Sequence, residues 1–113
     1  MPLVHGIVNN ICVIDIEGSF ASDIKSNLKD YVRPLTSDPK LKGFVLNMER
    51  IDFIDSAFLG IIVSVFKMLN TSRLKLGVCK INKECLNVFH LSQMDKIISI
   101  YQTEEEALEN LLK

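Results

Sequence analysis

Residues 44–60 read FVLNMERIDFIDSAFLG, and this stretch decides the fold. Its first part, Phe44–Met48, is almost continuously apolar, which is typical of a strand buried on both faces of a sheet. A short acidic loop follows, and the pair Asp55–Ser56 opens an unusually apolar helix. A buried strand that leads through a loop into a helix is the repeating unit of parallel α/β sheets, so the stretch predicts the α/β class.

Strands and helices alternate along the rest of the chain as well. Runs rich in β-branched residues alternate with segments whose apolar residues recur at helical spacing, and the expected order is β-β-α-β-α-β-α-β-α. We therefore expect a mixed sheet with right-handed crossovers, in which the opening hairpin forms an antiparallel edge. The expected strands are Leu3–Val8, Ile11–Ile16, Phe44–Met48, Leu74–Cys79 and Ile97–Tyr101, and the expected helices begin at Ser19 or Ser22, at Ser56, at Lys83 and after Thr103.

Length and charge limit the classes of function. The 113 residues fit a single domain, residues 1–113, with one core. A formal net charge of -1 provides no basic field that would attract nucleic acid or an anionic membrane. The N-terminus lacks a secretory signal, and the uncharged stretch Ser56–Phe66 is shorter than the ~18 apolar residues of a membrane span. We expect a cytoplasmic protein that binds a protein partner or a small ligand, with no direct nucleic-acid or membrane contact.

Catalytic and metal-binding alternatives have weak support in the sequence. Ser56 would need His5 or His90 as a base to act as a nucleophile, and no Gly-x-Ser-x-Gly elbow surrounds it. The glycine motifs of nucleotide-binding loops are missing too. We therefore expect no enzyme activity, no cofactor and no metal site. Buried free thiols are expected at the three cysteines, which form no Cys-x-x-Cys pair: Cys12, Cys79 and Cys85.

The helix after Ser56 carries apolar residues on two stripes. One stripe is expected to face the core, as in any amphipathic helix. The other is either buried under a neighbouring helix or exposed to a protein partner, since contiguous exposed apolar surface marks interaction sites. The expected core stripe is Leu59, Ile62, Phe66 and Leu69, and the second stripe is Phe58, Ile61, Val65 and Met68.

Ser56 is predicted to be the N-cap of this helix, because a serine hydroxyl there accepts a hydrogen bond from a backbone N–H that has no other partner. The same place accommodates a phosphate, since the amides and the positive end of the helix dipole favour an anion. A phosphate would add about -1.5 to -2 charges beside Asp55, with Glu49 and Asp52 close in sequence. Ser56 is therefore a candidate regulatory site.

The stretch 44–60 resembles the central signature of STAS domains, specifically of the bacterial anti-sigma factor antagonists. That signature is an apolar strand, a short acidic loop and then Asp-Ser-(Ser, Thr or Ala)-Gly-Leu-Gly at the start of a helix. The likeness continues through KLGVC at 75–79, VFHLS at 88–92, KIISI at 96–100 and TEEEAL at 103–108. The resemblance covers most of the chain and implies a STAS-like mixed β-sheet with about four helices.

The resemblance implies that the protein is an anti-sigma factor antagonist that works by partner switching. In the family, the unmodified antagonist binds an anti-sigma factor that is itself a serine kinase, and the sigma factor is released. The kinase phosphorylates the antagonist's serine and breaks the complex, and a metal-dependent serine phosphatase restores it. Carried over by position, Ser56 is the phosphorylation site. The expected partner-binding residues are Asp55, Ser56, Ala57, Phe58, Leu59, Ile61 and Val65.

Phe58 departs from the family pattern, which has glycine at this place. Glycine lets another backbone approach closely, whereas phenylalanine adds bulk next to Ser56. The departure is compatible with a different kinase partner, with an apolar anchor in the interface, or with loss of phosphorylation. In the last case the chain would be a STAS-like adaptor that binds a protein partner without a phosphorylation cycle.

Overall fold

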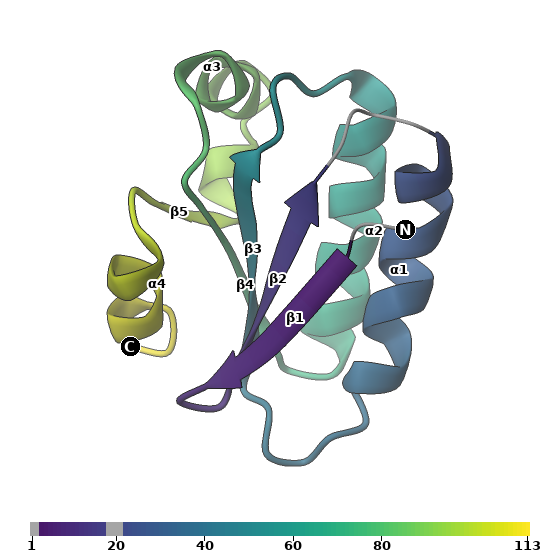
Figure 1. Ribbon diagram of the computed structural model, residues 1–113, viewed down its shortest axis with the longest axis vertical. Coiled ribbons are helices and arrows are strands. Elements are labelled where there is room, and N and C mark those ends of the chain that lie inside the picture. The colour runs from purple at the N-terminus through teal and green to yellow at the C-terminus, as the bar shows by residue number, and fades with distance from the viewer. Residues whose placement is uncertain (1–2, 18–21) are drawn as a thin grey trace.

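The computed structural model of the chain describes residues 3–17 and 22–113 and contains one five-stranded sheet with helices on both faces (Figure 1). The predicted α/β class and the predicted order of strands and helices are confirmed. The strands are β1 (Leu3–Val8), β2 (Ile11–Glu17), β3 (Gly43–Arg50), β4 (Lys75–Cys79) and β5 (Ser99–Tyr101). The helices are α1 (Ser22–Leu35), α2 (Ser56–Thr71), α3 (Lys83–Leu91) and α4 (Glu104–Asn110), and the 3₁₀ helix η1 (Met94–Lys96) precedes β5.

Several strand boundaries differ from the prediction by one or two residues: β2 extends to Glu17, β3 runs from Gly43 to Arg50, and β4 begins at Lys75. The last strand begins at Ser99 and not at Ile97, because the N–H groups of Ile97 and Ile98 donate to the Met94 carbonyl, at 3.1 Å and 3.0 Å, and close η1. The alternative cap at Ser19 lies outside the described residues, and α1 begins at Ser22. None of these differences changes the topology of the sheet.

The sheet has the strand order β1-β2-β3-β4-β5, with β1 antiparallel to β2 and the other neighbours parallel. Asn9 and Asn10 form the turn of the opening hairpin with φ values of 52° and 66°. Asparagine tolerates this left-handed conformation, which a two-residue hairpin turn needs at both positions. The hairpin therefore supplies the antiparallel edge that the sequence predicts.

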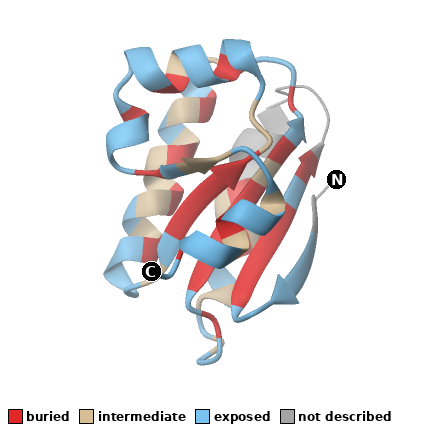
Figure 2. Cartoon of the chain, turned by 90° about the vertical axis from the view of Figure 1, so that its left-hand side faces the viewer, coloured by how far each residue is buried: buried red, intermediate tan, exposed pale blue. Residues whose placement is uncertain are grey.

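Helices α1 and α2 cover one face of the sheet, α4 covers the other, and α3 lies at the carboxyl end of the strands (Figure 1). Side chains of β3 alternate between the two layers, so Phe44 and Leu46 enter the larger core cluster and Val45 the smaller one under α4. Figure 2 shows the central strands buried as predicted. Within the described part of the chain, no helix is both long and apolar enough to cross a membrane.

Two glycines let α4 approach the sheet closely. Gly43 and Gly77 lie on neighbouring strands, and a Cβ atom on either would stand 2.9 Å or 3.1 Å from a methyl carbon of Leu111. Ala107 and Leu111 are buried between α4 and the sheet, whereas Leu112 is 40% exposed. The helix ends at Asn110, before the turn that would carry Leu112 inward.

The three cysteines are buried free thiols, as the sequence predicts. Burial raises the pKa of Cys12 to about 11. Burial, together with the nearby Glu104 carboxylate, raises the pKa of Cys79 to about 12. Both thiols are therefore neutral at physiological pH and poor nucleophiles.

Candidate functional site

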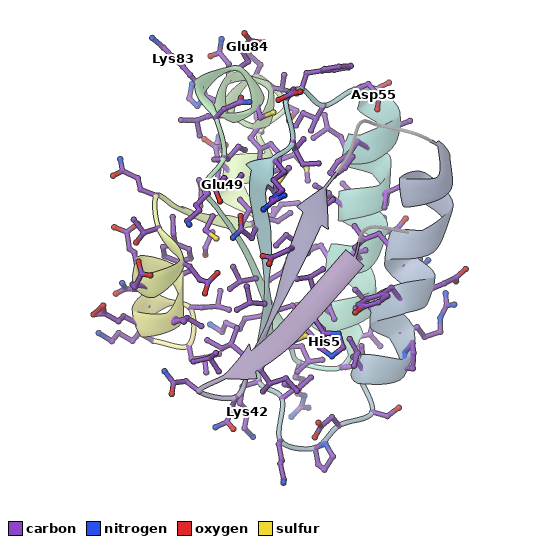
Figure 3. The ribbon with its side chains drawn as sticks, viewed as in Figure 1. His5, Lys42, Glu49, Asp55, Lys83 and Glu84 are labelled. Carbon is purple, nitrogen blue, oxygen red and sulfur yellow. The ribbon has the colours of Figure 1, made fainter. Side chains whose placement is uncertain are left out.

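Ser56 lies at the end of the sheet where the parallel strands finish. β3 ends at Arg50, and a five-residue loop leads from there to the first residue of α2. Ile51 and Ile54 are buried and fix the loop to the core, which leaves Phe53 between them 55% exposed. In open α/β sheets this edge is where ligands and partners bind. Figure 3 shows Asp55 at this end of α2, on the same side of the molecule as the start of α3.

The N-cap of α2 is Asp55, so the predicted cap at Ser56 is wrong. Asp55 has extended backbone angles (φ -112°, ψ 178°), and its Oδ1 accepts a 2.8 Å hydrogen bond from the Phe58 N–H. Aspartate caps helices as well as serine does, and its negative charge adds a favourable interaction with the helix dipole. The helix therefore begins at Ser56 itself.

The Ser56 side chain is exposed, because the capping contact is made by its neighbour. No hydrogen bond to the Ser56 hydroxyl is found among the described residues. The hydroxyl occupies the first turn of α2 without holding that turn together. It is therefore accessible to a modifying enzyme.

Phe58 points into the core and is 1% exposed, so its predicted contribution to a partner surface is wrong. Val65 is fully buried as well, and the same correction applies to it. The buried stripe of α2 takes two residues from each predicted stripe: Phe58, Ile62, Val65 and Leu69. These residues repeat at intervals of four, three and four, the spacing of one helix face. Phe58 therefore adds no bulk at the surface around Ser56.

The other predicted contact residues remain at or near the surface. Ala57 is exposed, whereas Leu59 and Ile61 are half-buried and pack against the edge of the core. Gly60 is exposed, and a Cβ atom built there would meet nothing within 4 Å. We define the α2 entry surface as Phe53 of the loop together with four residues from the first turns of α2: Ser56, Ala57, Gly60 and Ile61. The sequence prediction missed Phe53, although an aromatic residue in an otherwise acidic loop was a usable signal.

Asn82 fixes the loop that carries Ser56. Its side-chain oxygen caps α3 by accepting a 2.8 Å hydrogen bond from the Cys85 N–H, so α3 begins at Lys83 as predicted. Its side-chain amide also donates to the carbonyls of Ile51 and Asp52, at 3.1 Å and 2.9 Å. These two bonds span about thirty residues of sequence and were not predicted. One residue thus ties the start of α3 to the loop before α2.

Acidic groups surround the start of α2. Asp52 and Glu49 are exposed, and Glu49 lies 3.8 Å from the Lys80 ammonium group in a solvated pair.

Both histidines, the candidate bases for Ser56, have other partners. His5 bonds the Tyr31 hydroxyl, and His90 lies 3.1 Å from Asp95. Among the described residues, none supplies Ser56 with the hydrogen-bonded base that a nucleophile needs. The site presents an exposed hydroxyl at the same end of the molecule as exposed carboxylates.

A family model described as the STAS domain matches residues 4–107. The chain belongs to the STAS domain family. Apart from Leu3 of β1 and the last three residues of α4, the match spans all strands and helices of this STAS domain, including the α2 entry surface. The predicted family is thereby confirmed.

One curated relative of this STAS domain is the "Anti-sigma F factor antagonist" of Paenibacillus polymyxa. The two are 33% identical over 67 residues, which is 59% of this chain and 57% of the relative. A second curated relative, from Thermotoga maritima, is 32% identical over 66 residues, or 58% of each chain. The STAS domain thus spans somewhat more than half the length of the curated relatives it matches.

Solved structures share the fold over almost the full chain. An anti-sigma factor antagonist from Mycobacterium paratuberculosis superposes with a TM-score of 0.83 at 18% identity, covering 98% of this chain and 93% of that one. The anti-sigma factor antagonist SpoIIAA in its unphosphorylated form gives a TM-score of 0.81 at 17% identity, over 97% and 96% of the two chains. SpoIIAA from Bacillus has also been solved in its phosphorylated form, with a TM-score of 0.73 at 18% identity, over 95% and 96%.

Proposed function

We propose that this STAS domain is an anti-sigma factor antagonist whose binding is controlled by phosphorylation of Ser56. The family membership, the name of the Paenibacillus polymyxa relative and the two forms of SpoIIAA support the proposal. One observation carries it: the Ser56 hydroxyl is exposed in the first turn of α2, while Asp55 makes the capping bond. Modification of Ser56 therefore changes the surface and leaves the cap intact.

The partner binds the α2 entry surface when Ser56 is unmodified. Phe53 offers an exposed aromatic side chain, a residue type that is enriched at protein interfaces. Gly60 leaves open space on the helix, so a partner's backbone can approach α2 closely there. Asp55 lies at the edge of this surface and completes the predicted contact set with Ala57, Leu59 and Ile61.

A phosphate on Ser56 acts on the partner and not on the fold. Helix N-termini favour anions, so α2 tolerates the modification. The added charge of about -1.5 to -2 joins Asp52, Asp55 and Glu49 at one end of the molecule. Against a surface that fits the neutral hydroxyl, this charge costs several kcal/mol, and each ~1.4 kcal/mol lowers affinity tenfold.

The proposed partners are those of the partner-switching cycle. The anti-sigma factor is a serine kinase that binds unmodified Ser56 and phosphorylates it, and a metal-dependent serine phosphatase removes the phosphate. The STAS domain itself is a regulator without enzyme activity, and the cycle runs in the cytoplasm. The adaptor alternative rested on Phe58, and the burial of Phe58 takes that argument away.

Intact-mass measurement after incubation with the cognate kinase and ATP tests the phosphorylation step. We expect the wild-type chain and a Ser64→Ala control, altered in the middle of α2, to gain the mass of one phosphate. Ser56→Ala is expected to gain none. Phosphate uptake by Ser56→Ala, or none by the wild type, would contradict the proposal.

A further inference from the structure

A cavity of about 520 Å³ lies at the opposite end of α2 from Ser56. It is formed by the end of α2, the start of β4, strand β5 and the end of α4. The 16 residues of α2 make a helix about 24 Å long, so the cavity is remote from the α2 entry surface. Its volume falls within the range of ~300–1,000 Å³ that is usual for small-molecule sites.

Three cationic side chains line this cavity: Arg73, Lys75 and Lys113. No aspartate or glutamate belongs to the lining, and no described carboxylate forms an ion pair with any of the three. Ser99 and Tyr101, which carry hydroxyl groups, belong to the lining as well. Three positive charges without acidic partners on a concave surface favour a multiply charged anion.

Arg73 occupies a backbone position that favours glycine. It follows the C-cap of α2 with φ 60°, and the next residue closes the helix with a 2.8 Å bond from its N–H to the Leu69 carbonyl. A left-handed residue directly after a helix is most often glycine, because glycine has no Cβ to clash. The chain thus keeps a guanidinium group at the cavity at some conformational cost.

The lining of the cavity also includes apolar and aromatic residues, next to the amides of Asn70 and Asn110. Gly77 lets two side chains lie against β4, since a Cβ there would stand 3.1 Å from Leu111 and 3.2 Å from the Tyr101 ring. Phe66 of α2 contributes a second aromatic residue to the lining. The cavity therefore combines a cationic part with a surface on which a ring or a short hydrocarbon can pack.

We propose that this cavity binds a small organic phosphate monoester. Arg73 and Lys75 hold the phosphate, because guanidinium groups bind phosphate oxygens in pairs and lysine supplies a compact charge. The organic part packs on Tyr101 and Leu111. A phosphate monoester carries close to two negative charges at neutral pH, which matches the excess of cations better than a carboxylate does. The proposal is independent of the state of Ser56.

Calorimetric titration of the full chain with phenyl phosphate tests the proposal. We expect saturable binding with a dissociation constant below about 1 mM, weaker binding of inorganic phosphate, and none of phenol. Lys75→Gln is expected to raise the dissociation constant about tenfold or more, as loss of one charge-assisted contact does. Arg33→Gln, which removes an exposed cation on α1 that is paired with Asp30, is expected to have no effect.

The Arg73→Gly variant distinguishes a loss of phosphate binding from a loss of folding. Glycine suits the left-handed backbone, so the variant is expected to keep or raise its melting temperature while its dissociation constant rises about tenfold. Absence of saturable binding by the wild type would overturn the proposal. Unchanged affinity in both Arg73→Gly and Lys75→Gln would overturn it as well, because the cations would then not hold the phosphate.

Discussion

Alanine substitutions at two adjacent residues, Asp55 and Ser56, should have very different effects on stability. The Asp55 carboxylate accepts the 2.8 Å capping bond from the Phe58 N–H, whereas Ser56 is exposed and makes no capping bond. Replacement of a capping side chain by alanine costs about 1 kcal/mol. Ser56→Ala removes no contact of this kind and should stay within about 0.5 kcal/mol of the wild type.

These free energies translate into measurable melting temperatures. A chain of 113 residues has an unfolding entropy near 0.24 kcal/mol/K, from about 2.1 cal/mol/K per residue. Asp55→Ala should therefore lower the Tm by about 4 °C and Ser56→Ala by less than about 2 °C. Asp55→Asn keeps the acceptor and loses only the charge near the helix dipole, so its Tm should fall between the two.

Thermal unfolding followed by circular dichroism at 222 nm is the assay, with all three variants at one protein concentration. A Tm loss for Ser56→Ala as large as that for Asp55→Ala would refute the assignment of the cap. It would also weaken the proposed function, because a serine that holds the helix together is poorly placed to be modified reversibly.

Three further outcomes are expected. In urea unfolding, Gly60→Ala should raise the free energy of unfolding by about 1 kcal/mol, because nothing lies within 4 Å of the added Cβ. Gly43→Ala should lower it by about 1–3 kcal/mol, because its Cβ would press on α4. The reverse order of stability would contradict the packing. Burial raises the pKa of Cys79 to about 12, so above pH ~9 this thiol keeps its proton in the folded state and loses it in the unfolded state. The free energy of unfolding should therefore fall by up to about 1.4 kcal/mol per pH unit above pH ~9. Asn82→Ser keeps a cap for α3 but loses the two hydrogen bonds from the side-chain amide to the loop. Backbone hydrogen exchange at residues 51–54 should therefore become faster, while α3 stays protected. An unchanged exchange rate at 51–54 would show that these two bonds do not hold the loop.

The order of the elements could be predicted because each is set by local pattern. Asn9 and Asn10 mark the hairpin, Phe44–Met48 reads as a strand buried on both faces, and Asn82 marks the start of α3. Such signals need no knowledge of distant residues. The shortening of β5 was missed because Ile97 and Ile98, whose N–H groups close the single turn of η1, also fit a strand pattern.

The start of α2 shows where local pattern is insufficient. Asp55 and Ser56 are equally good caps by residue type, so the sequence could not decide between them. The apolar arc of α2 is wide, and its buried part is set by the packing of α1 and the sheet against it, so Phe58 and Val65 were assigned to the wrong face. Long-range contacts such as those of Asn82 with the loop have no signature in the sequence.

The central claim is that a phosphate on Ser56 weakens partner binding without unfolding α2. The most direct measurement is the affinity of the anti-sigma factor for the unmodified chain and for the chain phosphorylated at Ser56, with helix content checked for both. Ser37→Asp, which adds a negative charge at the other end of the sheet, is the matched control. We expect at least about a hundredfold weaker binding for the phosphorylated chain and unchanged binding for Ser37→Asp. Equal affinities for the unmodified and phosphorylated chains, both folded, would contradict the claim.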